Sequence, residues 1–78
     1  MPRLFVEGPY RFFFYASDRT EPPHVHVERD ENKAKFWLAP VSLEKSIGFR
    51  GHELRVIERI VAEKQQRLLD DWHEYFGE

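Results

Sequence analysis

The sequence predicts an α+β fold: a small antiparallel sheet of three to five strands packed against one long C-terminal helix. Polar and apolar residues alternate along residues 24–28 and 33–38, as in strands that bury one face. The apolar residues of 52–76 recur instead at the 3.6-residue spacing of a helix. A chain of 78 residues has room for one domain, so we expect residues 1–78 to form a single unit.

Composition and charge exclude several classes of protein. Cysteine is absent, so no disulfide can form, and a small core must be supported by aromatic packing, a metal or a partner chain. The net charge of −2 disfavours broad nonspecific binding to nucleic acid or anionic membranes. No segment has the run of ~20 apolar residues that a membrane span needs. The N-terminus lacks the apolar run of a signal peptide, and we expect a cytoplasmic protein.

The first predicted element is a β-hairpin. Leu4 to Glu7 and Tyr10 to Ala16 are strand-like, and Gly8-Pro9 between them fits a type II′ turn, in which Gly takes a positive φ. The second strand is apolar on nearly both faces, which predicts a place inside the sheet rather than at its edge.

A loop, Ser17 to Pro23, precedes two further strands. Pro22-Pro23 either simply ends the loop or holds the next residue rigidly. An even-length turn between the strands places their apolar residues on one face. The opposite face then points outward and carries His24, His26, Glu28, Lys33, Lys35 and Trp37.

The remaining chain predicts a short strand from Val41 to Lys45, a glycine-containing connection, and a helix from His52 to Phe76 that Gly77 ends. An unbroken helix of this length spans roughly 37 Å, more than a six-residue strand of about 20 Å. Its apolar end would overhang the sheet. We therefore expect either that the helix bends back or that another chain covers this end.

One group of side chains is suited to chemistry, namely Asp18, His24, His26 and Glu28. A His-x-His pair on a strand directs both imidazoles to one side, with Cα atoms roughly 6.6–7 Å apart. Such a pair can ligate one divalent metal, with Asp18, His52 or His73 as the third ligand. It can also perform acid–base catalysis. In the structural interpretation, both histidines are ordinary polar residues on the solvated face of an edge strand.

The aromatic strand and nearby basic residues also allow contact with RNA or phosphate. Arg19 and Lys35 are the candidates for holding phosphate, because they lie near the histidines in the predicted sheet. The aromatic residues of Tyr10–Tyr15 are equally needed for the core. The chain has no glycine-rich phosphate loop, serine nucleophile elbow or cysteine nucleophile, so we expect no organic cofactor.

Most of the chain resembles a known family. The segments that carry the resemblance are Tyr10–Tyr15, Asp18–Glu28, Ala34–Leu38, Glu53-Leu54 and Trp72–Phe76. They resemble the small bacterial proteins grouped as domain of unknown function 4160. The resemblance implies a protein encoded beside a second small protein, in pairs that look like toxin–antitoxin modules.

Three functions follow as hypotheses. The first is a partner-binding component of a two-gene, toxin–antitoxin-like module, which contacts its partner or a second copy of itself through Trp72, Tyr75 and Phe76. The alternative is a small hydrolase or ribonuclease that uses His24 or His26 as base or metal ligand, with Asp18 orienting it. The third is a metal-binding domain without catalysis.

Overall fold

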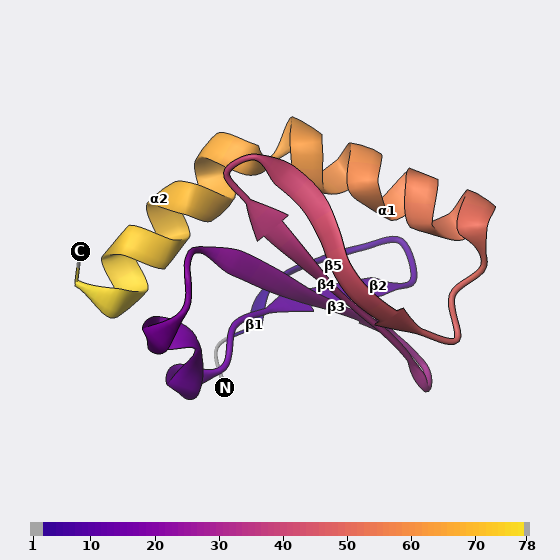
Figure 1. Cartoon of the computed structure of the whole chain (residues 1–78), viewed down its shortest axis with the longest axis horizontal. Helices are drawn as coiled ribbons and strands as arrows, with labels where there is room; N and C mark the ends of the chain where they lie inside the picture. The colour runs from indigo at the N-terminus through magenta and orange to yellow at the C-terminus, as the bar shows by residue number, and fades with distance from the viewer. Residues whose placement is uncertain (1–2, 78) are drawn as a thin grey trace.

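The computed structural model describes residues 3–77 and contains one five-stranded antiparallel sheet. The elements in chain order are β1 (Arg3–Glu7), β2 (Tyr10–Phe13), η1 (Ala16–Thr20), β3 (His24–Arg29), β4 (Asn32–Leu38), β5 (Val41–Ile47), α1 (Gly51–Glu63) and α2 (Gln65–Phe76). The strands lie in the sheet in the same order as in the chain, so each pairs with its sequence neighbour. The helices run along one side of this sheet (Figure 1). The α+β fold predicted from the sequence is confirmed.

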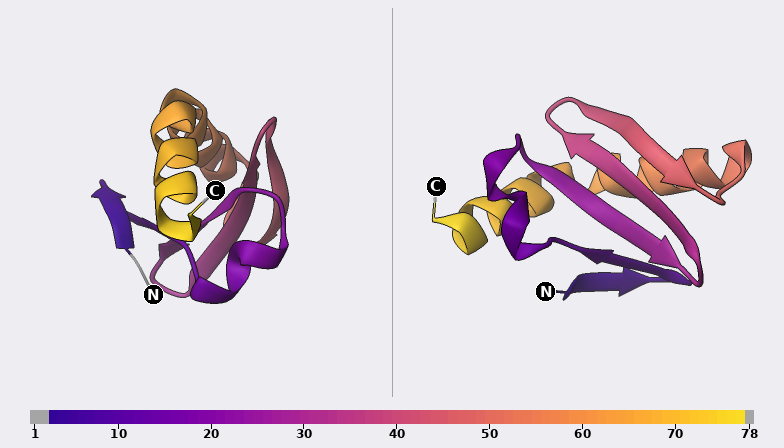
Figure 2. Two further views of the ribbon diagram at one scale, coloured as in Figure 1. Left: turned by 90° about the vertical axis from the view of Figure 1, so that its left-hand side faces the viewer. Right: turned by 60° about the horizontal axis from the view of Figure 1, so that its bottom comes forward.

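The predicted hairpin and turns are present, with one change. β1 and β2 pair across Gly8-Pro9, and Gly8 has the positive φ of 58° that the predicted turn requires. β2 ends at Phe13 instead of Ala16, because the chain turns into the short 3-10 helix η1 inside the predicted loop. η1 lies beside the end of the sheet that α2 approaches, as both views in Figure 2 show.

Residue pairing between β3 and β4 confirms the predicted division of faces. Val25 pairs with Phe36 and Val27 with Ala34, and all four side chains are buried in the core. The helices contribute the other side of that core through Ile57, Ile60, Val61, Leu68, Trp72 and Phe76. The outward face carries His26 opposite Lys35 and Glu28 opposite Lys33.

The single long helix is wrong in detail, because the helical segment bends at Lys64. Lys64 ends α1 and precedes α2, with φ −106° and ψ 16°. Hydrogen bonds continue across the bend, from Lys64 N–H to the Ile60 carbonyl and from Leu68 N–H to the Lys64 carbonyl. The bend turns α2 toward the end of the sheet where η1 lies (Figure 1). The overhang that a straight helix would produce is thereby avoided, as one of the two sequence-based alternatives predicted.

Burial at the end of α2 changes the predicted partner surface. Trp72 is 1% exposed and Phe76 is 9% exposed, because both rings pack on Phe14 at ring-centroid distances of 5.2 and 6.0 Å. Tyr75 keeps 44% exposure. Of the three residues predicted to contact a partner, the structure therefore leaves only Tyr75 on the surface.

No helix within residues 3–77 is long and apolar enough to cross a membrane.

Candidate functional site

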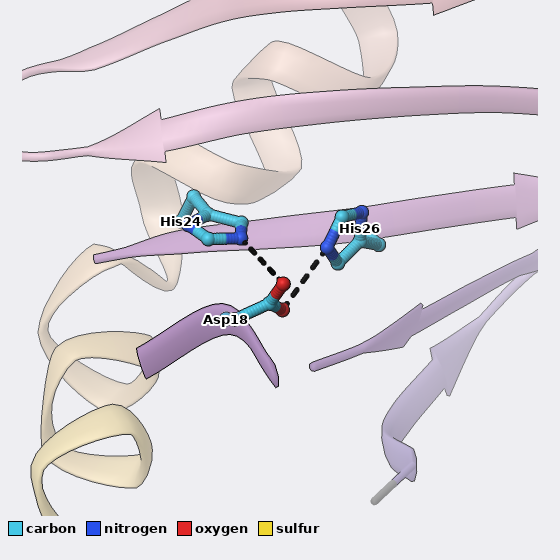
Figure 3. Close-up of side chains that lie close together, drawn as sticks. All are labelled: Asp18, His24 and His26. Atoms are coloured by element: carbon cyan, nitrogen blue, oxygen red, sulfur yellow. Dashed lines mark hydrogen bonds and ion pairs between the residues drawn. The ribbon is translucent and has the colours of Figure 1, made fainter. Parts of the chain in front are cut away.

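The structure brings together three of the residues that the sequence singled out. Asp18 comes from η1, and His24 and His26 come from the first half of β3. One side-chain ligand atom from each lies within 4.8 Å of the other two. Figure 3 shows the Asp18 carboxylate between the two imidazole rings. We call these three residues the Asp-His-His cluster.

Local backbone geometry fixes the position of Asp18. Its carboxylate Oδ2 accepts a hydrogen bond from the Tyr15 backbone N–H at 2.8 Å. Its own backbone N–H donates to the Tyr15 carbonyl at 3.0 Å. This reciprocal arrangement is the one that acidic side chains make near the start of a helical turn. The Tyr15 backbone therefore holds the Asp18 carboxylate in place beside the histidines.

The two histidines contact opposite oxygens of this carboxylate. Nε2 of His26 lies 3.0 Å from Oδ2 and forms a hydrogen bond with it. Nε2 of His24 lies 3.1 Å from Oδ1. The second contact does not have the direction of a hydrogen bond, so Nε2 of His24 is a buried nitrogen without a hydrogen-bond partner among residues 3–77. The other nitrogen of His24, Nδ1, lies 2.9 Å from the Pro22 carbonyl oxygen.

His24 is enclosed, which corrects the prediction that both rings point into solvent. Its side chain is 0% exposed and lies 5.6 Å from the Trp37 ring and 5.2 Å from the Trp72 ring. β3 is the middle strand of the sheet rather than an edge, and both η1 and α2 approach its first residue. His26 keeps 17% side-chain exposure, so the cluster meets solvent through this second histidine.

Aromatic packing holds the His26 ring. The ring stacks on Phe13 at a centroid distance of 5.5 Å and lies 4.6 Å from the Tyr15 ring. Burial lowers the pKa of His26, and the adjacent Asp18 carboxylate opposes that shift only in part. A neutral imidazole, with its proton on Nε2 toward the ionised Asp18 carboxylate, is therefore favoured near neutral pH.

Contacts with neighbouring groups lower the pKa of Asp18. Burial acts to raise it, but the hydrogen bonds from the Tyr15 backbone N–H and from His26 act in the opposite direction, and the net shift is downward. The carboxylate is therefore ionised under physiological conditions. An ionised carboxylate between two imidazole nitrogens is a set of donors suited to a divalent cation.

Of the other predicted site residues, Lys35 lies beside the cluster and the rest lie elsewhere. His52 and His73, the alternative third ligands, are exposed on α1 and α2, and neither belongs to the group of possible ligands found within residues 3–77. Arg19 is exposed on η1. Lys35 lies next to the cluster, opposite His26 in the neighbouring strand.

Glu21 and Lys45 lie at this site although the sequence predicts no site role for either. Glu21 lies 2.5 Å from the Lys35 ammonium and 3.8 Å from Nδ1 of His24. Lys45 reaches the same face as His26 because β5 carries an extra residue between Leu43 and Lys45. A bulge of this kind has no reliable sequence signal.

These observations define a small α+β protein with a buried histidine–carboxylate cluster on one face of its sheet. A family model described as Domain of unknown function (DUF4160) matches residues 10–73, and the chain belongs to that family. The matched region includes the whole Asp-His-His cluster. Parallel comparisons with curated proteins and with solved structures gave no match.

Proposed function

We propose that this protein is a metal-dependent hydrolase whose single metal ion is held by Asp18, His24 and His26. The observation that carries the proposal is the environment of His24 Nε2. This nitrogen is buried, has no hydrogen-bond partner among the described residues and lies 3.1 Å from a carboxylate oxygen. Buried polar atoms nearly always have a partner, and an exception calls for a specific explanation.

The proton of a neutral His24 ring can be assigned from its neighbours. A carbonyl oxygen only accepts hydrogen bonds, so the contact with the Pro22 carbonyl places the proton on Nδ1. Nε2 then carries a lone pair and lies 3.1 Å from a carboxylate oxygen, which is also rich in electrons. A cation shared by the two atoms makes this contact favourable. Metal-ligating histidines commonly donate their other ring N–H to a carbonyl in this way.

Distances within the cluster fit ligands of a common ion. Nitrogen and oxygen ligands about 2.1 Å from a metal lie roughly 3.0–3.4 Å apart at the usual coordination angles. The two nitrogen–carboxylate contacts measure 3.1 and 3.0 Å. The cluster's ligand atoms are at most 4.8 Å apart, so small side-chain shifts, with transfer of the His26 proton from Nε2 to Nδ1, bring all three onto one ion.

Two imidazoles and one carboxylate indicate a first-row transition metal. Imidazole nitrogen suits Zn²⁺ and Fe²⁺, whereas Mg²⁺ and Ca²⁺ prefer oxygen ligands. Catalytic zinc sites keep three protein ligands and leave one position for water. The metal lowers the pKa of that water and so supplies hydroxide near neutral pH. This is the basis for assigning hydrolysis rather than a structural metal role.

The proposal is tested by metal analysis of the untagged protein and by calorimetric titration of the chelator-treated protein with ZnCl₂. One ion per chain is expected for the wild type. His26→Ala and Asp18→Asn should each lower zinc affinity by at least roughly a hundredfold, as expected for the loss of a direct ligand. The matched control is His73→Ala, which removes an exposed histidine from α2 and should leave binding unchanged.

A circular-dichroism melt of each variant separates lost ligation from lost folding. Asp18→Asn keeps the side-chain shape, so its folded fraction provides the secure comparison. Equal zinc affinity in wild type, His26→Ala and Asp18→Asn would rule out this centre. A hydrolytic activity that survives chelation would instead support the metal-free mechanism, in which Asp18 orients His26 as a general base.

A partner protein is the second candidate function, and exposed apolar side chains favour it. Leu43 and Ile47 on the edge strand β5 are 42% and 66% exposed, and Tyr75 on α2 is 44% exposed. An edge strand with apolar side chains can pair with another chain. The family resemblance makes the second small protein of a toxin–antitoxin-like gene pair the expected partner, in the cytoplasm.

Co-expression with the product of the neighbouring gene tests the partner hypothesis. A stable complex should form, and Tyr75→Ala or Ile47→Lys should weaken it. Ala62→Lys, which adds the same charge at an exposed position of α1, serves as the control. Separate elution of the two proteins at micromolar concentration would exclude a stable pair.

A further inference from the structure

A shallow basic cleft lies beside the Asp-His-His cluster. Its volume is about 200 Å³, and it lies on the sheet face that the helices leave open. Six of its lining residues carry polar groups: Tyr15, His26, Lys33, Lys35, Lys45 and Ser46. Because His26 belongs to both, the cleft adjoins the cluster.

The lysines converge through strand pairing. His26 is opposite Lys35 across β3 and β4, and Lys35 is opposite Lys45 across β4 and β5. Alternation along β4 adds Lys33 to the same face. In a strand with regular alternation Lys45, two residues after Leu43, would share its face, and Leu43 pairs with the core residue Phe36. The bulge in β5 therefore turns Lys45 into the cleft.

Positive charge in the cleft exceeds the negative charge around it. The Lys35 ammonium is paired with Glu21, and Glu28, on the same face, is paired with Arg11 at 2.9 Å. Within residues 3–77 neither Lys33 nor Lys45 has an ion-pair partner. Two ammonium groups are thus available to an anion from outside, although the protein as a whole carries a net charge of −2.

We infer that this cleft binds the phosphate of a single nucleotide unit and holds it next to the metal held by the cluster. The inference rests on the proposed function, because it names the substrate of that same centre. A volume of about 200 Å³ is below the usual range for drug-sized ligands and suits one phosphate with its sugar. Lys33 and Lys45 bind the phosphate oxygens. Tyr15, 38% exposed at the rim, offers a ring on which a base stacks.

The reaction at this site is hydrolysis of a phosphate ester. The metal-bound water gives one proton to solvent, and its oxygen forms a bond to phosphorus. The bond from phosphorus to the leaving sugar oxygen breaks, and that oxygen takes up a proton from solvent. The products are an alcohol and a phosphate with one P–OH group more, and no oxidant, reductant or organic cofactor is needed.

Binding of defined probes tests the inference on the zinc-loaded protein. Adenosine monophosphate and a single-stranded adenosine hexanucleotide are titrated into wild type, Lys45→Ala, Lys33→Ala and Arg59→Ala. Each cleft variant should bind both probes roughly tenfold more weakly, as expected for the loss of one charge-assisted hydrogen bond. Arg59→Ala removes the same charge from an exposed position on α1 and should bind like wild type.

The relative affinity of the probes identifies the source of the phosphate. Tighter binding of the hexanucleotide assigns an RNA chain, and equal binding assigns a free nucleotide; both support the inference. Lys45→Ala and Lys33→Ala proteins that hold one zinc ion yet bind the probes like wild type would overturn the inference while leaving the metal centre intact. Absence of zinc in the wild type would overturn the proposed function itself.

Discussion

Nε2 of His24 lies 3.1 Å from Oδ1 of Asp18 without the geometry of a hydrogen bond. The same His24 ring is fixed on its other side by the Pro22 carbonyl, 2.9 Å from Nδ1. The ring is therefore oriented by its backbone neighbour toward a carboxylate that it does not hydrogen-bond. His24 is therefore a structural residue and, in the proposed function, also a ligand, and the two roles predict different results.

His24 should be much more important for stability than His26 when no metal is present. His24→Ala removes a fully buried ring from between two tryptophans and should cost about 2–4 kcal/mol of unfolding free energy. His26→Ala removes a half-buried ring and should cost about 1 kcal/mol. Urea unfolding in excess chelator measures both. Equal losses for the two variants would show that the burial of His24 contributes little.

Trp72 should act as a core residue rather than as a contact for another chain. Trp72→Ala leaves a cavity next to Phe14 and His24 and should destabilise the isolated protein by about 3–5 kcal/mol. Tyr75→Ala, three residues later and exposed, should change stability by less than about 1 kcal/mol. Thermal melts of the isolated proteins provide the comparison. A Trp72→Ala protein with the melting temperature of wild type would contradict the packing described here.

Stability should fall in acid partly through Glu53 at the start of α1. Arg29 donates two hydrogen bonds to this carboxylate, at 2.6 and 2.9 Å, and Tyr10 donates a third at 2.9 Å. The Arg29 hydrogen bonds lower the pKa of Glu53 below its usual 4.5, although burial opposes them. Since the folded-state pKa is depressed, the stabilisation is complete above about pH 5 and is lost as pH falls through the folded-state value.

Glu53→Gln tests this link between the sheet and α1. The variant should be less stable than wild type at pH 7, and the difference should shrink as the pH is lowered from 5 to 3. Chemical unfolding at pH 7, 5 and 3 measures the trend. The matched control is Glu58→Gln, at an exposed position of the same helix. A constant difference between Glu53→Gln and wild type at all three pH values would contradict the assignment.

Much of the fold could be predicted because residue alternation is a local property. The pairing of Val25 with Phe36 follows directly from the pattern of two strands and a short turn. The outward direction of His26 follows from the same pattern. The burial of His24 could not be predicted, since it depends on α2 approaching the strand end after the bend at Lys64.

The residues that line the cleft could not all be predicted from local sequence patterns either. The sequence predicts Lys35 as a phosphate contact because Lys35 shares a predicted face with the histidines. It places Lys45 in a short strand without a defined face, and only the extra residue in β5 brings Lys45 opposite Lys35. Bulges depend on pairing over the whole sheet. The sequence therefore predicts the Asp-His-His cluster well and the cleft beside it only in part.

Long-range ¹H–¹⁵N correlation spectra of the histidine rings test the central claim, that Asp18, His24 and His26 share one metal ion, most directly. In the chelator-treated protein His24 should carry its proton on Nδ1. Addition of one equivalent of ZnCl₂ should shift Nε2 of His24 and His26 and leave both nitrogens of His52 and His73 unchanged. A His24 ring protonated on Nε2, or zinc-dependent shifts confined to His52 and His73, would contradict the account.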